Sequence, residues 1–131
     1  VQILGTWCPN CRDETEFLVN YLRENESKDL KIIALAFEKH RDKEKAFNAI
    51  RTYQEHFKMN YEMAYAGWYN KKEAVKSLPM LNHILSYPTM IFLDRDNKVR
   101  KIHTGFAGPA TTDYEPFKQE FDTFVKQLLS E

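Results

Sequence analysis

The sequence lacks three features that would each indicate a class of protein. It has no net charge, because 19 Lys and Arg residues balance 19 Asp and Glu residues. Nothing in that balance would draw the chain to nucleic acid or to an acidic membrane surface. It has no apolar run near the ~20 residues that span a bilayer, and no repeat, low-complexity tract or linker. We therefore expect one domain over 1–131 and exclude nucleic acid as a partner.

The chain also lacks an initiator methionine and the pattern of a cleavable export signal. It opens on VQILGTW, which is typical of the middle or end of a β-strand. We therefore expect that an upstream segment is missing. Part of the first strand would be missing with it, as would any export signal or membrane anchor.

The sequence does contain enough apolar residues for a core in one soluble domain, with a hydrophobic content of 43% and an aromatic content of 14%. Strand-like and helix-like patterns alternate along it, which favours the α/β class. Predicted strands cover 1–4, 30–37, 61–67 and both arms of a hairpin around the turn residues 94–98. Predicted helices open at Asp13, at a capping Asp42 and near Lys71, where Pro79 interrupts the third, and a last helix carries Phe117, Phe121, Phe124 and Leu128.

The only two cysteines lie in GTWCPNCRDE, residues 5–14, between the first strand and the first helix. A structural zinc site needs four ligands, but the histidines are scattered singly along the chain. They are His40, His56, His83 and His103. Covalent haem attachment needs a histidine where Arg12 stands, and a disulfide that only closes a four-residue loop would add roughly 2 kcal/mol. We therefore expect neither a metal nor an organic cofactor.

Redox exchange fits the cysteine pair better. It needs a thiolate at the start of a helix, where unpaired N–H groups and the helix dipole favour negative charge, and a second thiol one turn further on. Cys8 lies in the turn and Cys11 follows three residues later. We predict dithiol–disulfide exchange, with Cys8 as the exposed nucleophile of lowered pKa and Cys11 as the more buried partner.

The motif WCPNC after a strand, the later stretch SYPTMIFLD and the terminal hairpin and helix resemble the thioredoxin superfamily over nearly the whole chain. The TlpA/ResA-like branch of bacterial thiol-disulfide oxidoreductases is the most similar. Its features here are Glu14 three residues after Cys11, an insert at about 58–80, and LPMLNHILSYPT before the proline strand. The resemblance implies a thioredoxin-like α/β sandwich, with a central mixed sheet and helices on both faces.

In such a protein Pro88 would be a cis-proline facing the cysteines, and the backbone of Tyr87 would pair with an extended substrate segment. Trp7, Pro9 and Thr89 would contribute to the same substrate-binding surface. The alternatives are a trans proline that starts a strand, a tryptophan that only packs and a threonine that is only a β-former. Three more aromatic residues either shape a groove near the insert or pack in the core: Tyr65, Trp68 and Tyr69.

The resemblance also implies a catalytic role for Glu14, whose carboxylate would help to move the proton of Cys11. The alternative is a solvent-exposed glutamate of the first helical turn that interacts only with the helix dipole. Asp13 and Glu16 are competing carboxylates nearby. Glu16 stands where the branch commonly has a helix-kinking proline, so we expect a straighter helix.

The resemblance implies an enzyme that acts on protein disulfides, that a membrane-embedded thiol donor keeps reduced, and that works outside the cytoplasm, in the bacterial periplasm. We expect a monomer acting as a reductase, although the residues between the cysteines help to set the potential and leave the opposite direction open. Two other classes also stay open. One is a peroxide-reducing thiol enzyme, whose Pro-x-x-x-Thr-x-x-Cys loop is absent, and the other is a binding module with a vestigial cysteine pair.

Overall fold

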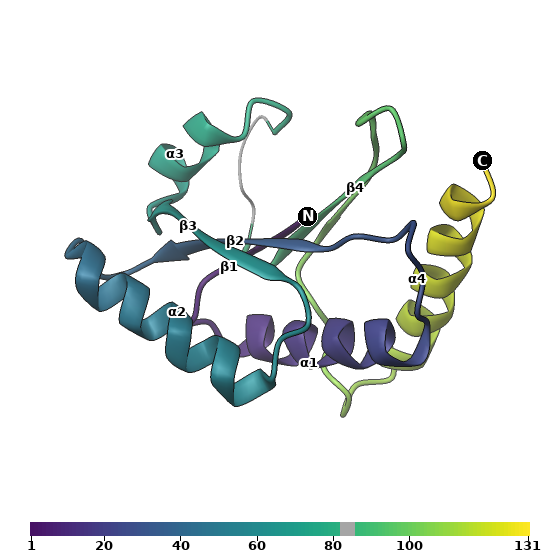
Figure 1. Ribbon diagram of the computed structural model, residues 1–131, viewed down its shortest axis with the longest axis horizontal. Helices are drawn as coiled ribbons and strands as arrows, with labels where there is room; N and C mark the ends of the chain where they lie inside the picture. The colour runs from purple at the N-terminus through teal and green to yellow at the C-terminus, as the bar shows by residue number, and fades with distance from the viewer. Residues whose placement is uncertain (82–85) are drawn as a thin grey trace.

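The computed structural model describes residues 1–81 and 86–131, and within these ranges the chain forms a five-stranded mixed sheet with helices on both faces (Figure 1). The strands in chain order are β1 (Gln2–Leu4), β2 (Ile33–Glu38), β3 (Glu62–Trp68), β4 (Thr89–Leu93) and β5 (Val99–Thr104). Their order in the sheet is β3-β2-β1-β4-β5. The strands β1, β2 and β3 are parallel, whereas β4 is antiparallel to both of its neighbours.

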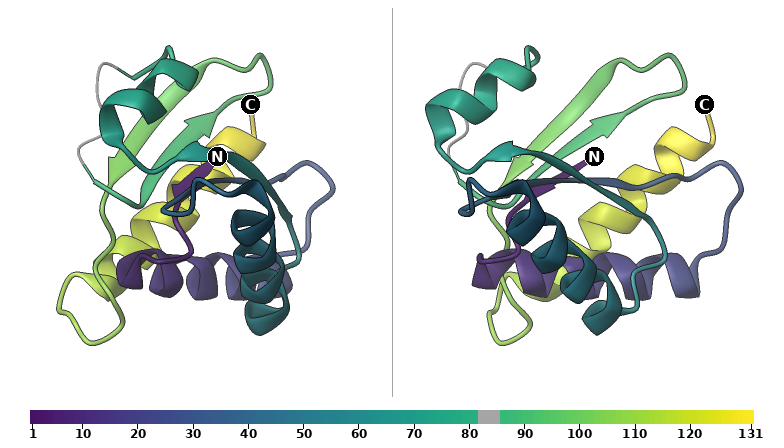
Figure 2. Two further views of the ribbon diagram at one scale, coloured as in Figure 1. Left: turned by 90° about the vertical axis from the view of Figure 1, so that its left-hand side faces the viewer. Right: turned by 60° about the vertical axis from the view of Figure 1, so that its left-hand side comes forward.

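Among the described residues, two long helices and one short helix lie between strands, and a third long helix follows β5. They are α1 (Pro9–Glu24), α2 (Lys43–Phe57), α3 (Lys71–Ala74) and α4 (Tyr114–Leu129), with a 3-10 turn, η1 (Val75–Ser77), directly after α3. The connections β1–α1–β2 and β2–α2–β3 cross the sheet in the same direction. Because such crossovers are right-handed, both helices must lie on one face. Figures 1 and 2 show α1, α2 and α4 on that face and α3 on the other.

Helix α1 begins at Pro9, one turn before the predicted start at Asp13, so that prediction was wrong. The reason is local: Cys8 has extended backbone angles and its sulfur accepts a hydrogen bond from the Cys11 amide, which makes Cys8 the N-cap. Pro9 follows at the first helical position, where a missing N–H costs nothing. Both cysteines therefore belong to the start of α1.

The functional edge of the sheet is set by strand direction. The three parallel strands end at the same edge, and β4 begins there because it is antiparallel to β1. In open α/β sheets, ligands bind beyond the carboxyl ends of the strands. The turn 5–8, the segment after β2, the end of β3 and the segment 86–88 before β4 consequently meet at one place.

An aromatic core lies on the face of the sheet that carries the three long helices, which we call the helical face. Phe17 on α1 lies at its centre and contacts five other rings at centroid separations of 5.0 to 6.4 Å. The partners are Tyr21, Phe106, Tyr114, Phe117 and Phe121. They come from α1, from the segment between β5 and α4, and from α4. Phe17 therefore joins the first helix to the C-terminal part of the chain, which is far from it in sequence.

Helix α2 matches its predicted pattern closely. Asp42 is its N-cap and accepts a hydrogen bond from the Glu44 amide at 2.9 Å. Ala46, Ile50 and Tyr53 are buried on one stripe. The insert after α2 contains β3, α3 and η1, so its helical part is shorter than the sequence pattern indicates. His83 lies outside the described residues.

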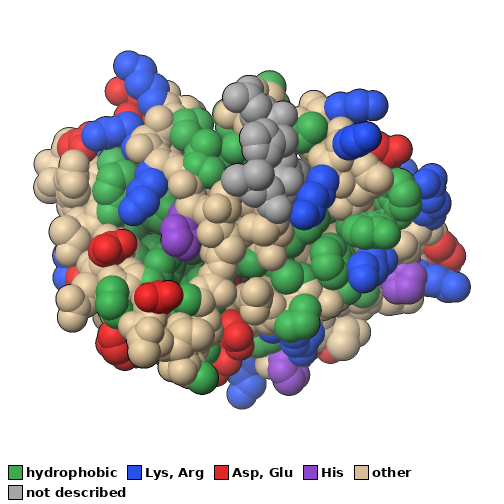
Figure 3. Space-filling view, turned by 180° about the vertical axis from the view of Figure 1, so that it is seen from behind, with side chains coloured by type: hydrophobic (Ala, Val, Ile, Leu, Met, Phe, Trp, Pro, Cys, Tyr) green, Lys and Arg blue, Asp and Glu red, His purple; other side chains and the backbone are tan. Residues whose placement is uncertain are grey.

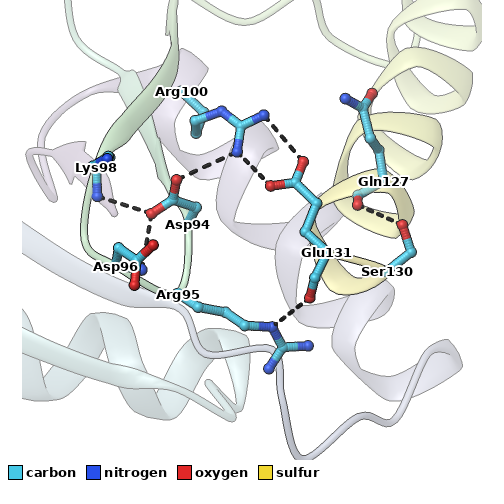
Figure 4. A network of polar contacts seen from close by, with 8 residues as sticks. All are labelled: Asp94, Arg95, Asp96, Lys98, Arg100, Gln127, Ser130 and Glu131. Atoms are coloured by element: carbon cyan, nitrogen blue, oxygen red, sulfur yellow. Dashed lines mark hydrogen bonds and ion pairs between the residues drawn. The ribbon is translucent and has the colours of Figure 1, made fainter.

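The β4–β5 hairpin is joined to the end of α4 by a polar network (Figure 4). Arg100 on β5 contacts the carboxylates of Asp94 and Glu131, and Arg95 donates to the backbone carbonyl of Glu131 at 3.1 Å. The Asp94 carboxylate also accepts from the amides of Asp96 and Lys98, which shapes the turn. The network therefore fixes the position of the last helix relative to the edge hairpin.

The surface has no dominant charge. Figure 3 shows hydrophobic, acidic and basic side chains interspersed on the face opposite to the view of Figure 1. None of the described helices is long and apolar enough to cross a membrane.

Candidate active site

The turn before α1 is tightly constrained. The Cys8 amide donates to the Gly5 carbonyl at 3.1 Å, which closes the turn. A Cβ atom on Gly5 would lie 2.2 Å from the Trp7 indole nitrogen and 2.9 Å from the Phe37 carbonyl oxygen. Only glycine fits at this close approach. The turn consequently places Cys8 at the N-terminal end of α1 and packs Trp7 against the end of β2.

Cys8 lies at the positive end of α1, where its sulfur accepts the Cys11 amide hydrogen at 3.3 Å. A hydrogen bond from the Cys11 thiol, helped by the amides of Cys11 and Asn10 and by the charge of Lys39, lowers the pKa of Cys8 to about 7. Its exposed fraction is only 5%, so the prediction of an exposed nucleophile was wrong. The backbone of Tyr87 covers the sulfur, since the Cys8 thiol donates to the Tyr87 carbonyl at 3.5 Å.

Cys11 lies behind Cys8 and is fully buried. Burial is the main cause that raises its pKa, and the thiol that donates to Cys8 is further stabilised in its neutral form. The two thiols therefore differ in the predicted direction, with a low pKa at Cys8 and a high pKa at Cys11. No disulfide joins the two cysteines in the structure.

Glu14 follows one turn after Cys11 and is also fully buried. Neither of its carboxylate oxygens has a hydrogen-bond partner among the described residues. Burial raises the pKa of Glu14 to about 8. The alternative of a solvent-exposed glutamate is therefore wrong, whereas Glu16 is exposed and Asp13 is half-buried.

A buried chain of polar side chains lies beside Glu14. The Gln2 amide donates to the Thr15 hydroxyl at 3.1 Å, and the hydroxyls of Thr15 and Tyr53 are 2.7 Å apart. Tyr53 also donates to the Cys11 carbonyl at 3.3 Å, and Tyr61 donates to the Gln2 side chain at 2.9 Å. No sequence pattern indicates this chain, because its members look like ordinary strand and helix residues.

The segment before β4 forms the opposite wall of the site. The Tyr87–Pro88 peptide bond is cis, and the Tyr87 carbonyl lies against Cys8 as described above. Thr89 is buried, and its hydroxyl donates to the Ser86 carbonyl at 2.7 Å, so it fastens the segment and does not reach the thiols through its hydroxyl. Pro9 is exposed at the rim.

The end of β2 anchors the rim of the site. The buried Glu38 carboxylate accepts from the Thr6 amide at 2.9 Å and from the Thr6 hydroxyl. The Phe37 carbonyl accepts from the Trp7 indole at 2.9 Å, and the Glu38 carbonyl accepts from the Tyr69 amide at 3.0 Å. Residues from the turn and from the insert are thus tied to the same two residues of β2.

Trp7 forms one side of the site together with Tyr69 and Tyr87, whose rings meet it edge-on at 5.6 and 5.4 Å. Trp68 contacts Tyr69 in the same way at 5.3 Å. Tyr65 does not belong to this group, because its ring meets Phe47 of α2 on the helical face. The predicted cluster of three aromatic residues is therefore divided between the two faces of the sheet.

Lys39 lies above this group, with its ammonium nitrogen 4.5 Å from the centroid of Trp7. Glu38 and Lys39 open the charged run 38–45 before α2. The sequence of this run gives no sign that its first residue is buried and that its second lies on a ring, so neither residue was predicted as part of the site. Within residues 1–81 and 86–131, no three His, Cys, Asp or Glu side chains come together as metal ligands.

Comparison with known proteins gives the fold. No family model and no curated protein matches this sequence. The solved structures similar to the chain include three with sequence identities below 20%. A thiol-disulfide isomerase from Corynebacterium glutamicum has a TM-score of 0.71 at 15% identity, with 99% of this chain and 79% of that chain covered.

The second is a protein assigned as the thiol:disulfide interchange protein DsbE from Chlorobium tepidum, with a TM-score of 0.65, 19% identity and coverage of 93% of this chain and 75% of that one. The third is a protein assigned as a thioredoxin from Neisseria meningitidis, with a TM-score of 0.66, 18% identity and coverage of 99% and 75%. The chain therefore has a thioredoxin-like fold, as predicted from the sequence.

Proposed function

We propose that this protein is a thiol-disulfide oxidoreductase that exchanges its Cys8–Cys11 dithiol with disulfides of other proteins, acting as a reductase. One observation carries the proposal: Cys8 is the N-cap of α1 with a pKa lowered to about 7, and Cys11 is buried one turn behind it. A thiolate attacks disulfides, so a thiol that ionises near neutral pH is suited to the first step.

In the first step the Cys8 thiolate attacks one sulfur of a substrate disulfide, the substrate S–S bond breaks, and the other substrate sulfur leaves as a thiolate. In the second step Cys11 loses its proton and attacks Cys8, which releases the second substrate thiol and leaves a Cys8–Cys11 disulfide. Two electrons pass from the protein to the substrate. A thiol donor must then return the pair to the dithiol form.

Glu14 is suited to accept the proton of Cys11 in the second step. It lies one turn after Cys11 on α1, and the negative charge of Cys8 helps to raise its pKa. Formation of the mixed disulfide removes that charge, so Glu14 ionises more readily when a proton acceptor is needed. The loss of the same Cys8 charge also makes the Cys11 thiol easier to ionise.

The features shared with the TlpA/ResA-like branch support a finer assignment. They are Glu14 after the cysteine pair and the insert, of which β3 and α3 form part. By that resemblance we place the protein in the bacterial periplasm, with a membrane-embedded thiol donor as its reductant. Trp7, Pro9 and the Tyr87–Pro88 segment are the residues proposed to meet the substrate.

Trapping the mixed disulfide tests the proposal. Cys11→Ser should accumulate a covalent adduct with a peptide disulfide through Cys8, detected by mass spectrometry and released by dithiothreitol. Cys8→Ser should form no such adduct. Trapping by Cys8→Ser alone would reverse the two roles, and equal trapping by both variants would show that the roles are not distinct. Failure of the wild-type protein to reduce any peptide disulfide would indicate a binding module.

A further inference from the structure

Two cations lie on the aromatic rings beside Cys8. Lys39 has its ammonium nitrogen 4.5 Å from the centroid of Trp7 and 5.5 Å from that of Tyr69. Arg41 has its guanidinium carbon 3.9 Å from the centroid of Trp68. The rings meet edge-on from Trp68 through Tyr69 to Trp7. A continuous surface therefore leads from the residue next to Cys8 to Arg41, and we call it the aromatic–cationic surface.

The charges on this surface are available to a partner. Both cations are exposed, and neither forms an ion pair with a carboxylate of any residue that the structure describes. The acidic neighbours in sequence are engaged elsewhere. Glu38 is buried against Thr6, and Asp42 accepts the Glu44 amide at the start of α2.

The rings hold the cations in place without neutralising them. A cation–π contact is worth about 0.5–1 kcal/mol at an exposed site, and it keeps the full positive charge, whereas an ion pair would cancel it. Half-buried aromatic rings also offer flat contact to an extended chain. The surface therefore combines positive charge with apolar contact at the side of the nucleophile.

We propose that the aromatic–cationic surface selects substrate segments in which acidic residues flank the disulfide-bonded cysteine, with Lys39 and Arg41 as the residues that meet their carboxylates. This inference rests on the proposed function and adds a substrate class to it. The occupant is a segment of a protein chain, because the surface extends over three rings and two cations, more than one small disulfide would cover. Opposite charges across such a contact chiefly raise the rate of productive encounter.

Three synthetic peptides test the inference. Each has the same length and carries one disulfide, and the residues two to four positions from each cysteine are glutamates, glutamines or lysines. The second-order rate of reduction by the reduced protein is measured for each by quenched-flow chromatography. We expect the acidic peptide to react about tenfold faster than the basic one at low ionic strength, with the ratio approaching one in 0.5 M salt, where screening is strong.

Variants locate the effect. Arg41→Gln and Lys39→Gln should each lower the acidic-to-basic ratio several-fold, and the double variant should bring it close to one. Lys101→Gln is the matched control, because Lys101 also lies over a ring, that of Phe124 at 5.2 Å, but on β5 next to α4. It should leave the ratio unchanged. The pKa of Cys8, followed by thiolate absorbance, separates a change in selectivity from a change in the nucleophile, since Lys39 also acts on that thiol.

The outcomes separate the two proposals. If the protein reduces the neutral reagent 2,2′-dithiodipyridine, and reduces the three peptides at rates equal to one another, the proposed function stands and the selectivity is overturned. A ratio that stays high in the double variant would also overturn it, because the selectivity would then arise elsewhere. A protein that reduces none of the four disulfides would overturn the proposed function itself.

Discussion

Burial raises the pKa of both Glu14 and Cys8, but only at Cys8 do hydrogen bonds outweigh it, so the two pKa values shift in opposite directions. The amide and thiol of Cys11 stabilise the Cys8 thiolate. Neither Glu14 oxygen has a partner within hydrogen-bond geometry among the described residues, and burial favours the neutral carboxyl more than the nearby Gln2 amide favours the carboxylate. A thiol of low pKa thus lies one helical turn before Cys11, and a carboxyl of high pKa lies one turn after it. Such a difference between two pKa values is typical of acid–base pairs.

Glu14→Gln should slow the release of the mixed disulfide several-fold, because no carboxylate remains to take the proton of Cys11. In the wild-type protein the rate should rise with pH below the Glu14 pKa of about 8, because the mixed disulfide lacks the Cys8 charge that helps to raise that pKa, and this part of the pH profile should disappear in the variant. Rapid-mixing kinetics from pH 6 to 10 measure both effects. Glu16→Gln, an exposed change two residues further on, is the control. An unchanged rate and profile in Glu14→Gln would contradict the catalytic role.

Glu14 should also make stability depend on pH. Its pKa is raised from 4.5 to about 8 in the folded protein, so between these values the unfolded chain has released the proton and the folded chain still binds it. The free energy of unfolding should therefore fall as pH rises from about 4.5 to about 8. Urea unfolding of the reduced protein at pH 5 and pH 8 should show a smaller loss in Glu14→Gln than in the wild type or in Glu16→Gln. The same loss in all three proteins would show that Glu14 is ionised in the fold.

The sequence predicts those residues of the site whose chemistry is carried by spacing. The cysteine pair is recognised from its two-residue gap, and the role of Glu14 is implied by the family resemblance, to which its position one turn after Cys11 contributes. Gln2 and Glu38 could not be recognised, because each looks like an ordinary strand residue. Their roles come from partners 13 and 32 positions away, Thr15 and Thr6, and such pairs are set by sheet topology.

At the scale of elements, the helix starts differ in how they are capped. Asp42 accepts the Glu44 amide at the start of α2, whereas Asp113 at the start of α4 makes no such hydrogen bond with its side chain. Cys8 caps α1 with a sulfur atom. The first helix therefore begins with the nucleophile itself, and its stability and its chemistry involve the same atom.

Asp42→Ala should lower the free energy of unfolding by about 1 kcal/mol, the usual cost of losing a capping side chain. Asp113→Ala is the matched control, since it removes the same side chain from the same position of a helix without removing a hydrogen bond. Chemical denaturation at pH 7 compares the two variants with the wild type. Equal losses in the two variants would mean that the negative charge near the helix start, and not the capping hydrogen bond, stabilises the fold.

Element boundaries were predicted well where capping chemistry is ordinary. The α2 start at Asp42 follows a familiar pattern, and its buried stripe has helical spacing. The predicted start of α1 is one turn too late, because a cysteine is an unusual cap. The helix predicted in the insert is longer than α3, because Lys71 to Ser77 lacks a clear apolar period. Aromatic residues of the insert were grouped although a strand directs neighbouring side chains to opposite faces.

At the scale of the whole molecule, the aromatic core around Phe17 connects α1, α4 and the segment before α4. Phe17→Ala should lower the free energy of unfolding by about 3–5 kcal/mol, as for other large-to-small changes in a packed core. Phe47→Ala, at a ring that is 43% exposed, should cost clearly less. Calorimetry and denaturant unfolding measure the difference, and similar losses at the two positions would show that Phe17 is not central to the core.

The architecture as a whole could be predicted because it depends on alternation and handedness. Strand and helix patterns in sequence, with right-handed crossovers, leave few arrangements open. The distribution of helices, with the three long ones on one face (Figure 2), needed the strand order β3-β2-β1, which no local pattern contains. The sheet edge that gathers the turn, the insert and the proline segment follows from that order.

The attachment of the rim to β2 has a consequence for how such a protein diversifies. Trp7 and Tyr69 are tied to the main-chain carbonyls of Phe37 and Glu38, and every amino acid supplies a carbonyl. A change of side chain at position 37 would therefore leave its acceptor in place, and exposed residues such as Lys39 and Arg41 contribute no bond to the attachment. We expect libraries randomised at positions 39 and 41 to keep the fold while their preferred substrates diverge.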